Sequence, residues 1–123
     1  MTMLRAVIVA ALLSVTPGCD GPSHDPRVPG GDAARGREAI RRYGCGSCHH
    51  ISGVQGARGI VGPSLRGLSA RPYLAGRLPN DPASLEAWIR RPRTLDPQTI
   101  MPDLAVSERD ARDIATFLLT QSR

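Results

Sequence analysis

The segment Cys45-Gly46-Ser47-Cys48-His49 constrains this chain more than any other stretch of its sequence. Two cysteines separated by two residues and followed at once by histidine are typical of a c-type haem attachment site. Each thiol can add to one vinyl group of the porphyrin, and His49 can then offer an axial nitrogen to the iron. The motif therefore predicts one covalently bound haem c, held by Cys45 and Cys48, with His49 as an iron ligand.

The cysteine spacing by itself has two other interpretations. Thioredoxin-like redox sites and half of a zinc site also contain C-x-x-C. No second cysteine pair follows in the sequence, and the surrounding residues show no βαβ pattern. Haem is therefore the favoured interpretation, and zinc binding and disulfide chemistry are its alternatives.

Composition agrees with a core built around a cofactor. The aromatic residues Tyr43, Tyr73, Trp88 and Phe117 are few for a domain in a chain of 123 residues. A buried porphyrin would supply the missing apolar volume.

The 16 basic residues are all arginine, and they exceed the 11 acidic residues to give a net charge of +5. A positive surface favours redox protein partners with an acidic docking surface. The basic residues are dispersed without interleaved aromatic residues, so we expect no nucleic-acid partner, and we expect no small-molecule substrate.

Residues 1–18 are predicted to be an export signal peptide of the lipoprotein type. Arg5 precedes an apolar run over residues 6–15. This run is shorter than the roughly 20 residues that cross a bilayer as a helix, and it suits a signal peptide. The domain is therefore expected on the periplasmic side of the cytoplasmic membrane.

Cys19 is the cysteine that the haem motif leaves over. The preceding Thr16-Pro17-Gly18 resembles a lipobox, although an aliphatic residue is more usual where Thr16 stands. Lipidation of Cys19 would remove an exposed thiol in an oxidising compartment. The alternative is cleavage nearby that leaves Cys19 free.

Residues 19–31 are rich in proline and glycine and are predicted to form a flexible tether, with His24 as a solvated linker residue. The folded domain is expected over residues 32–123. Asp32 can cap a helix that runs to about Arg42 and ends at Gly44. Gly36 within this helix indicates close approach of another helix, for which the C-terminal helix is the candidate.

Two further helices are indicated. Asp81-Pro82 provides a cap and a first-turn proline for a helix that Pro92 stops, and residues 93–106 then form an extended loop. Ser107 to Asp110 resembles a capping box for a last helix to about Gln121. No strand pattern is evident, so the predicted fold class is all-α.

Met101 is the methionine that lies outside the signal segment. A thioether opposite histidine is a known haem iron pairing that raises the reduction potential. The alternative is a methionine that fills a gap in the loop. Its flanking sequence, with Pro97 and Pro102, and its position 52 residues after His49 favour ligation of the iron.

Over residues 32–120 the sequence resembles the class I cytochromes c. The resemblance implies a small all-α cytochrome c fold with three to five helices around one haem, and with the N- and C-terminal helices crossing. It implies further haem contacts for Pro63 as hydrogen-bond acceptor for His49, Leu65 and Leu68 on the ring, Arg71 beside a propionate, Trp88 near the methionine, and Thr99 as a propionate donor.

Two departures from the family pattern concern the same region. Gln98 replaces a usual glycine in the turn before Met101, where glycine would permit positive φ. The stretch between Arg71 and Trp88 is shorter than in mitochondrial members, which implies a less covered propionate edge.

The expected function is one-electron transfer, and the protein is expected to be a carrier and not an enzyme. A subunit of a larger dehydrogenase or oxidase complex is one alternative, and a ligand-binding or catalytic haem protein with an open sixth position is another. Arginines 41, 42, 90, 91 and 93 are candidates to rim the exposed haem edge; the competing interpretation is scattered solvated charge.

Overall fold

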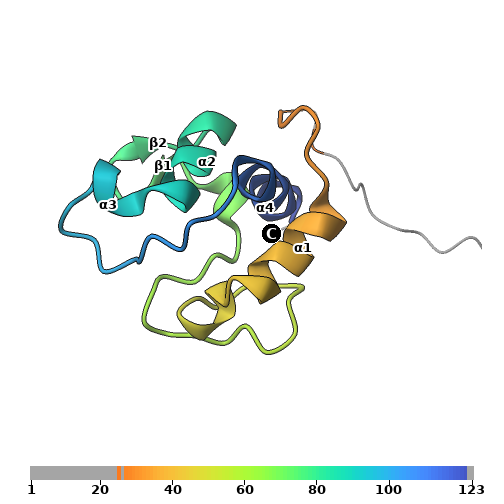
Figure 1. Ribbon diagram of the computed structural model, residues 1–123, viewed down its shortest axis with the longest axis horizontal. Helices are drawn as coiled ribbons and strands as arrows, with labels where there is room; N and C mark the ends of the chain where they lie inside the picture. Colours follow the sequence, from red (N-terminus) through yellow and green to blue (C-terminus); the bar gives the residue numbers. More distant parts are fainter. Residues whose placement is uncertain (1–24, 26, 122–123) are drawn as a thin grey trace, which may run out of the picture.

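The structure is a computed structural model in which residues 25 and 27–121 are described (Figure 1). The predicted export signal, Cys19 and His24 lie outside these residues. The elements in chain order are α1 Ala33–Arg42, η1 Cys45–Ser47, η2 Leu68–Ala70, β1 Tyr73–Leu74, β2 Leu78–Pro79, α2 Pro82–Arg90, α3 Pro92–Leu95 and α4 Glu108–Thr120.

The described domain is mostly helical, which confirms the predicted fold class, but it also contains a two-stranded hairpin that was not expected. Strands β1 and β2 pair antiparallel with Leu74 opposite Leu78. The turn between them contains Ala75 and Gly76, both with positive φ. Strands of two residues are too short to show an alternating pattern, which is why the sequence did not reveal them.

Helix α1 begins and ends as its sequence predicts. The Asp32 side chain accepts a hydrogen bond from the Arg35 amide, and Gly44 adopts the left-handed conformation with φ 71° after the cap residue Tyr43. The left-handed turn redirects the chain into η1, so that the cysteine motif follows the helix directly.

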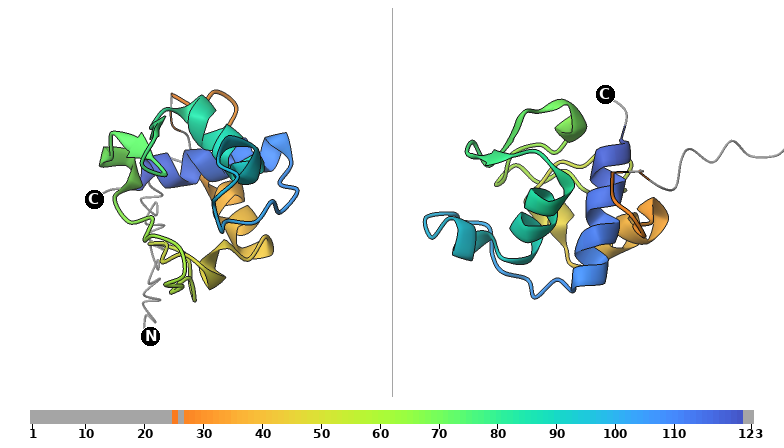
Figure 2. Two further views of the ribbon diagram at one scale, coloured as in Figure 1. Left: turned by 90° about the vertical axis from the view of Figure 1, so that its left-hand side faces the viewer. Right: turned by 90° about the horizontal axis from the view of Figure 1, so that it is seen from above.

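Helices α1 and α4 pack side by side and cross near the centre of the domain (Figures 1 and 2). Gly36 lies at the contact, where a Cβ atom would clash with the backbone carbonyl of Asp113. The close approach predicted for this glycine is confirmed, and the partner is the C-terminal helix.

The buried carboxylate of Asp113 stabilises the contact between α1 and α4. Asp113 is 1% exposed. It accepts hydrogen bonds from the Asp32 amide at 2.8 Å and from the Arg35 guanidinium at 2.7 and 2.8 Å. The start of α1 is thereby tied to the middle of α4.

Helix α2 matches its prediction, with Asp81 capping the Ser84 amide at 2.8 Å. The prediction of an extended loop over residues 93–106 is wrong at its start, because α3 covers Pro92–Leu95. Proline at the first helical position has a preset φ and lacks an amide that would need a partner, so Pro92 both ends α2 and begins α3.

Helix α4 is capped by the Ser107 hydroxyl, which accepts from the Asp110 amide at 3.1 Å. The reciprocal half of the predicted capping box is replaced. The Ser107 amide donates instead to the Tyr43 hydroxyl at 3.4 Å, and that hydroxyl donates to Asp110 at 2.8 Å. Tyr43 therefore connects the end of α1 to the start of α4.

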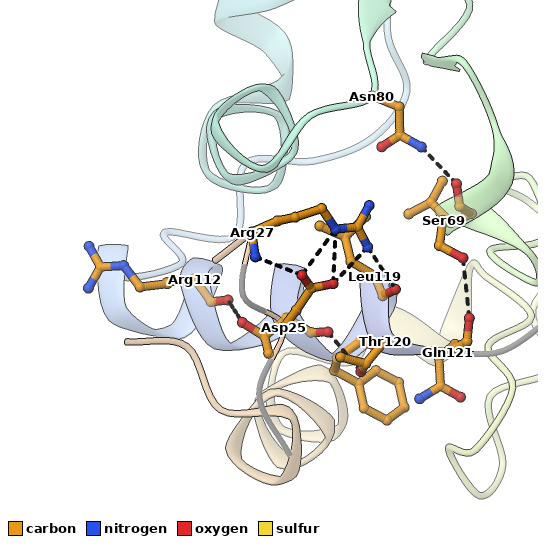
Figure 3. Close-up of polar contacts among 11 residues, drawn as sticks. Asp25, Arg27, Ser69, Asn80, Arg112, Leu119, Thr120 and Gln121 are labelled. Carbon is orange, nitrogen blue, oxygen red and sulfur yellow. Dashed lines mark hydrogen bonds and ion pairs between the residues drawn. The ribbon is translucent and has the colours of Figure 1, made fainter. Parts of the chain in front are cut away.

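Part of the predicted tether packs against the domain. Val28 is 2% exposed, and Arg27 donates to the Asp25 carboxylate and to the carbonyl of Leu119 at 3.2 Å (Figure 3). This segment therefore lies on the C-terminal part of α4. None of the helices within residues 25 and 27–121 is long and apolar enough to cross a lipid bilayer.

Candidate haem site

A cavity of about 510 Å³ lies among the end of α1, η1, η2, the hairpin, α2, α4 and the segment that contains Met101. Its volume is in the range of sites that enclose sizeable ligands. It is lined by every residue that the sequence nominated for the haem: Cys45, Cys48, His49, Pro63, Leu65, Leu68, Arg71, Trp88, Thr99 and Met101. The fold brings together residues that are up to 56 positions apart in the chain.

The imidazole of His49 is held in one orientation. Its Nδ1 lies 2.7 Å from the carbonyl oxygen of Pro63. Because a carbonyl can only accept, Nδ1 carries the proton, and Nε2 retains the lone pair that an iron ligand needs. Gly62 lies against the ring, where a Cβ atom would clash with the imidazole.

The two cysteines lie on one tight turn. The amides of Cys48 and His49 both donate to the Cys45 carbonyl, at 3.2 and 3.0 Å. Both cysteine side chains are partly buried, and burial raises the pKa of the Cys45 thiol. A neutral thioether therefore suits this position better than an ionised sulfur.

Two glycines allow the loop after the cysteine motif to pack closely against it. A Cβ atom on Gly46 would clash with Ala57, and one on Gly59 would clash with the backbone of Cys48. The loop after the motif thus folds back onto it, and the Gly59 amide donates to the Gly46 carbonyl at 3.1 Å. Ala57 and Gly59 of the following loop therefore pack against the turn that carries the two cysteines.

Met101 reaches the cavity from the segment between α3 and α4, and its amide donates to the Thr99 hydroxyl oxygen at 3.3 Å. The Thr99 hydroxyl keeps its own proton for another acceptor. Among the described residues other than glycine, positive φ occurs at Ala75 and Ala105, so Gln98 does not need the glycine conformation.

Arg71 lines the cavity and also supports its wall. Its Nη2 donates to the carbonyls of Ser64 at 2.6 Å and Arg66 at 2.9 Å. Ser64 follows Pro63, which accepts from His49. The guanidinium therefore supports the segment that orients the imidazole.

Sequence reasoning missed part of the wall. Tyr73, Leu74 and Ala75 of the hairpin line the cavity, so the short stretch after Arg71 contributes to its wall. Two apolar residues flanking an Ala-Gly turn were the available signal, and it was too short to interpret. Other apolar residues of the lining include Ile40, Ile51, Leu85, Ile89, Val106, Ile114 and Leu118.

Several of the arginines predicted to rim the haem edge have acidic neighbours. Arg42 pairs with Asp110 at 3.0 Å, and Arg41 and Arg90 each lie 3.9 Å from a glutamate. The hydroxyls of Ser107 and then Tyr43 donate to Asp110 and lower the pKa of that carboxyl. Part of the positive charge of these arginines is therefore balanced by carboxylates of the same domain.

The donor set fits a covalently attached haem. It offers two thiols two residues apart, an imidazole with Nδ1 already bonded, and a thioether, around a mostly apolar cavity. Over residues 25 and 27–121, no group of three or more His, Cys, Asp or Glu side chains is placed to hold a metal ion. Fold and site thus define a small helical protein built to hold haem.

Comparison with known proteins identifies the family. The cytochrome c family model matches residues 33–122, and the chain belongs to this family. Its cofactor is covalently bound haem c, and Cys45 and Cys48 have the C-x-x-C spacing of a haem attachment site. Its chemistry is haem-based electron transfer with redox partners.

A similar protein is the cytochrome c oxidase subunit 2 of Alkalihalophilus pseudofirmus, which is 33% identical over 87 residues. The match covers 70% of this chain and 25% of that relative, so the chain corresponds to about a quarter of the relative's length. No solved structure matches significantly.

Proposed function

We propose that this protein is a one-electron carrier in which His49 and Met101 hold the two axial positions of the haem iron in both oxidation states. The observation that carries the proposal is their shared cavity. His49 enters it from the loop after η1, and Met101 enters it from the segment before α4. With both positions held, no coordination site remains open for bond-making catalysis.

The chain's residues prepare this chemistry. When bound, haem supplies an iron that accepts and releases one electron between its ferric and ferrous states. The Pro63 carbonyl fixes the imidazole of His49 and increases its basicity as a ligand. A methionine thioether favours the ferrous state. Because the ligands do not change, little rearrangement accompanies the electron.

The remaining cavity residues have supporting roles in this proposal. Leu65, Leu68 and Trp88 pack on the ring, and Leu68 is 5% exposed. Arg71 pairs with a propionate through donors that its carbonyl bonds leave available, and Thr99 donates its hydroxyl proton to a propionate. A buried carboxylate needs such partners.

Absorption spectra of the purified protein in both redox states test covalent haem and methionine ligation together. The ferric protein should show the charge-transfer band that a methionine sulfur gives. The reduced protein should bind carbon monoxide slowly and incompletely. Rapid and complete binding would instead support the alternative of a ligand-binding or catalytic haem with an open sixth position.

The proposal also includes the cellular location of the protein. Residues 1–18 direct export, Cys19 becomes lipidated, residues 19–31 connect the lipid to the cytochrome c domain of 32–123, and this domain works at the periplasmic side of the cytoplasmic membrane. An apolar run too short to span a bilayer, followed by the lipobox-like segment, supports this. The intact mass of the mature N-terminus tests it: an unmodified Cys19, or cleavage elsewhere, would refute lipidation.

Membership in a larger oxidase complex is a second candidate. It is favoured by the similarity to a protein described as cytochrome c oxidase subunit 2. In either case the positive net charge favours docking to an acidic redox partner. Co-purification of stoichiometric subunits after gentle solubilisation would support the complex, and isolation of the chain alone would support the tethered carrier.

A further inference from the structure

Asn80 joins the hairpin to the turn before it. The residue stands directly after β2 and is not part of the cavity lining. Its Nδ2 donates to the carbonyls of Leu68 at 2.7 Å and Arg71 at 2.8 Å (Figure 3 shows this amide). Its backbone amide donates to the carbonyl of Pro72 at 3.1 Å. Three hydrogen bonds from one residue thus hold the segment from Leu68 to Pro72.

The Asn80 side chain leaves its other polar atom without a partner. Within the described part of the chain, Oδ1 is buried and accepts no hydrogen bond. Turning the amide over would place this oxygen against two carbonyl oxygens, so the two carbonyls determine its orientation. A buried acceptor without a partner costs free energy. The two hydrogen bonds that Nδ2 donates are therefore what this side chain contributes to the fold.

The two carbonyls belong to residues that face the haem site. Leu68 and Arg71 both line the cavity. The Arg71 guanidinium donates to the Ser64 carbonyl at 2.6 Å, and Ser64 adjoins Pro63, whose carbonyl lies 2.7 Å from Nδ1 of His49. Asn80 is therefore linked to the axial histidine through the backbone and side chain of Arg71.

We propose that Asn80 is a positioning residue for the haem site, which holds the backbone of Arg71 so that its guanidinium stays fixed beside the cavity. A fixed positive charge there favours the reduced state of the bound haem, because reduction adds a negative charge to the site. This inference rests on electron transfer by the haem domain, and it does not depend on the identity of the sixth ligand.

The first test compares a substitution of Asn80 with a substitution in η2, which Asn80 contacts through the Leu68 carbonyl. Asn80→Ala removes both side-chain donors. Ser69→Ala is the matched control, because the Ser69 hydroxyl donates at 3.2 Å to the carbonyl of Gln121 and Ser69 does not line the cavity (Figure 3). Measured on the haem-loaded full chain, Asn80→Ala should lower the reduction potential, and Ser69→Ala should leave it unchanged.

A double-mutant cycle then tests the route through Arg71. In an Arg71→Gln background, Asn80→Ala should no longer shift the potential. The proposal is overturned if the shift persists undiminished there, if Ser69→Ala produces an equal shift, or if Asn80→Ala causes no decrease. If Asn80→Ala yields no haem-loaded protein, Asn80→Ser, which retains one donor, is measured with the same expected direction.

Carbon monoxide binding by each reduced variant separates this inference from the proposed axial pair. Rapid binding by the wild-type protein would reject Met101 as the sixth ligand. The comparison of potentials between Asn80→Ala and Ser69→Ala would still decide the role of Asn80, because Arg71 lines the cavity in either case.

Discussion

Gly36 of α1 lies directly against the backbone carbonyl of Asp113 in α4. A Cβ atom at this position would also clash with the carbonyl carbon of Asp113 and lie in tight contact with the backbone nitrogen of Ile114. The obstacle is main chain, which cannot move aside as a flexible side chain would. The crossing of the two helices therefore depends on the absence of a side chain at residue 36.

Replacing Gly36 with alanine tests this contact. At an exposed helix position, glycine to alanine stabilises by about 1 kcal/mol. Here Gly36→Ala should lower the free energy of unfolding by about 2 kcal/mol or more, because overpacking forces the helices apart. Urea unfolding measures the effect. Ala34→Gly, at an exposed position of α1, is the control and should cost only about 1 kcal/mol. A variant as stable as the wild type would contradict the packing argument.

The second prediction concerns Met101. Met101→Leu conserves the side-chain volume and removes the sulfur, so the fold should be retained. The ferric methionine band should disappear, the reduction potential should fall, and the reduced protein should bind carbon monoxide rapidly. Leu95→Ile, in α3 and outside the cavity lining, should change none of these properties. An unchanged spectrum in Met101→Leu would show that another group ligates the iron.

The third prediction concerns the buried carboxylate of Asp113. Asp113→Ala removes the acceptor of three hydrogen bonds from the Asp32 amide and the Arg35 guanidinium, and it should cost about 3 kcal/mol of unfolding free energy. Glu38→Ala is the control, because Glu38 is 66% exposed and lies 3.9 Å from Arg41. Exposed pairs of this kind contribute roughly 0–1 kcal/mol. Equal losses in the two variants would refute the special role of Asp113.

The fourth prediction is a pH dependence at the cap of α2. The Ser84 amide and then the Ser84 hydroxyl donate to Asp81 and lower the pKa of its carboxyl. A lowered pKa in the folded state means that the carboxylate stabilises the fold above the unfolded pKa of about 3.9, and that this contribution is lost as the pH falls further. Asp81→Asn keeps a capping side chain, so it should have near wild-type stability at pH 7 and a smaller loss in acid.

Denaturant unfolding at a series of pH values measures this difference. Asp103→Asn makes the same change of charge at an exposed loop position and serves as the control. An equal flattening of the pH profile in both variants would attribute the effect to net charge and not to the helix cap.

Much of the site was predictable because its residues carry local signals. The cysteine pair and His49 are adjacent in sequence, and the caps at Asp32, Asp81 and Ser107 mark helix starts within a few residues. Such features depend on backbone chemistry close in the chain, which does not require knowledge of distant contacts. The resemblance to the class I cytochromes c predicted the further haem contacts, which are dispersed along the chain. All of these residues line the cavity.

Other features depend on partners far away in sequence. The Tyr43 hydroxyl bonds to Asp110, 67 residues later, and Val28 is buried although it lies within the segment rich in proline and glycine. Neither residue has a neighbour in sequence that indicates its partner. The hairpin likewise consists of a turn and two short strands. These strands are too short for an alternating hydrophobic pattern to predict their pairing.

The sequence by itself determined the cofactor chemistry, the helical class and the identity of the candidate ligands, because covalent spacing and helix caps are properties of short segments. Only the tertiary structure decided how the cavity wall is held. The bond from His49 to Pro63 was expected, but the guanidinium of Arg71 on Ser64 and the amide of Asn80 on Arg71 were not. Side-chain donors of this kind can reach any carbonyl that folding brings near them, and the fold alone selects which one.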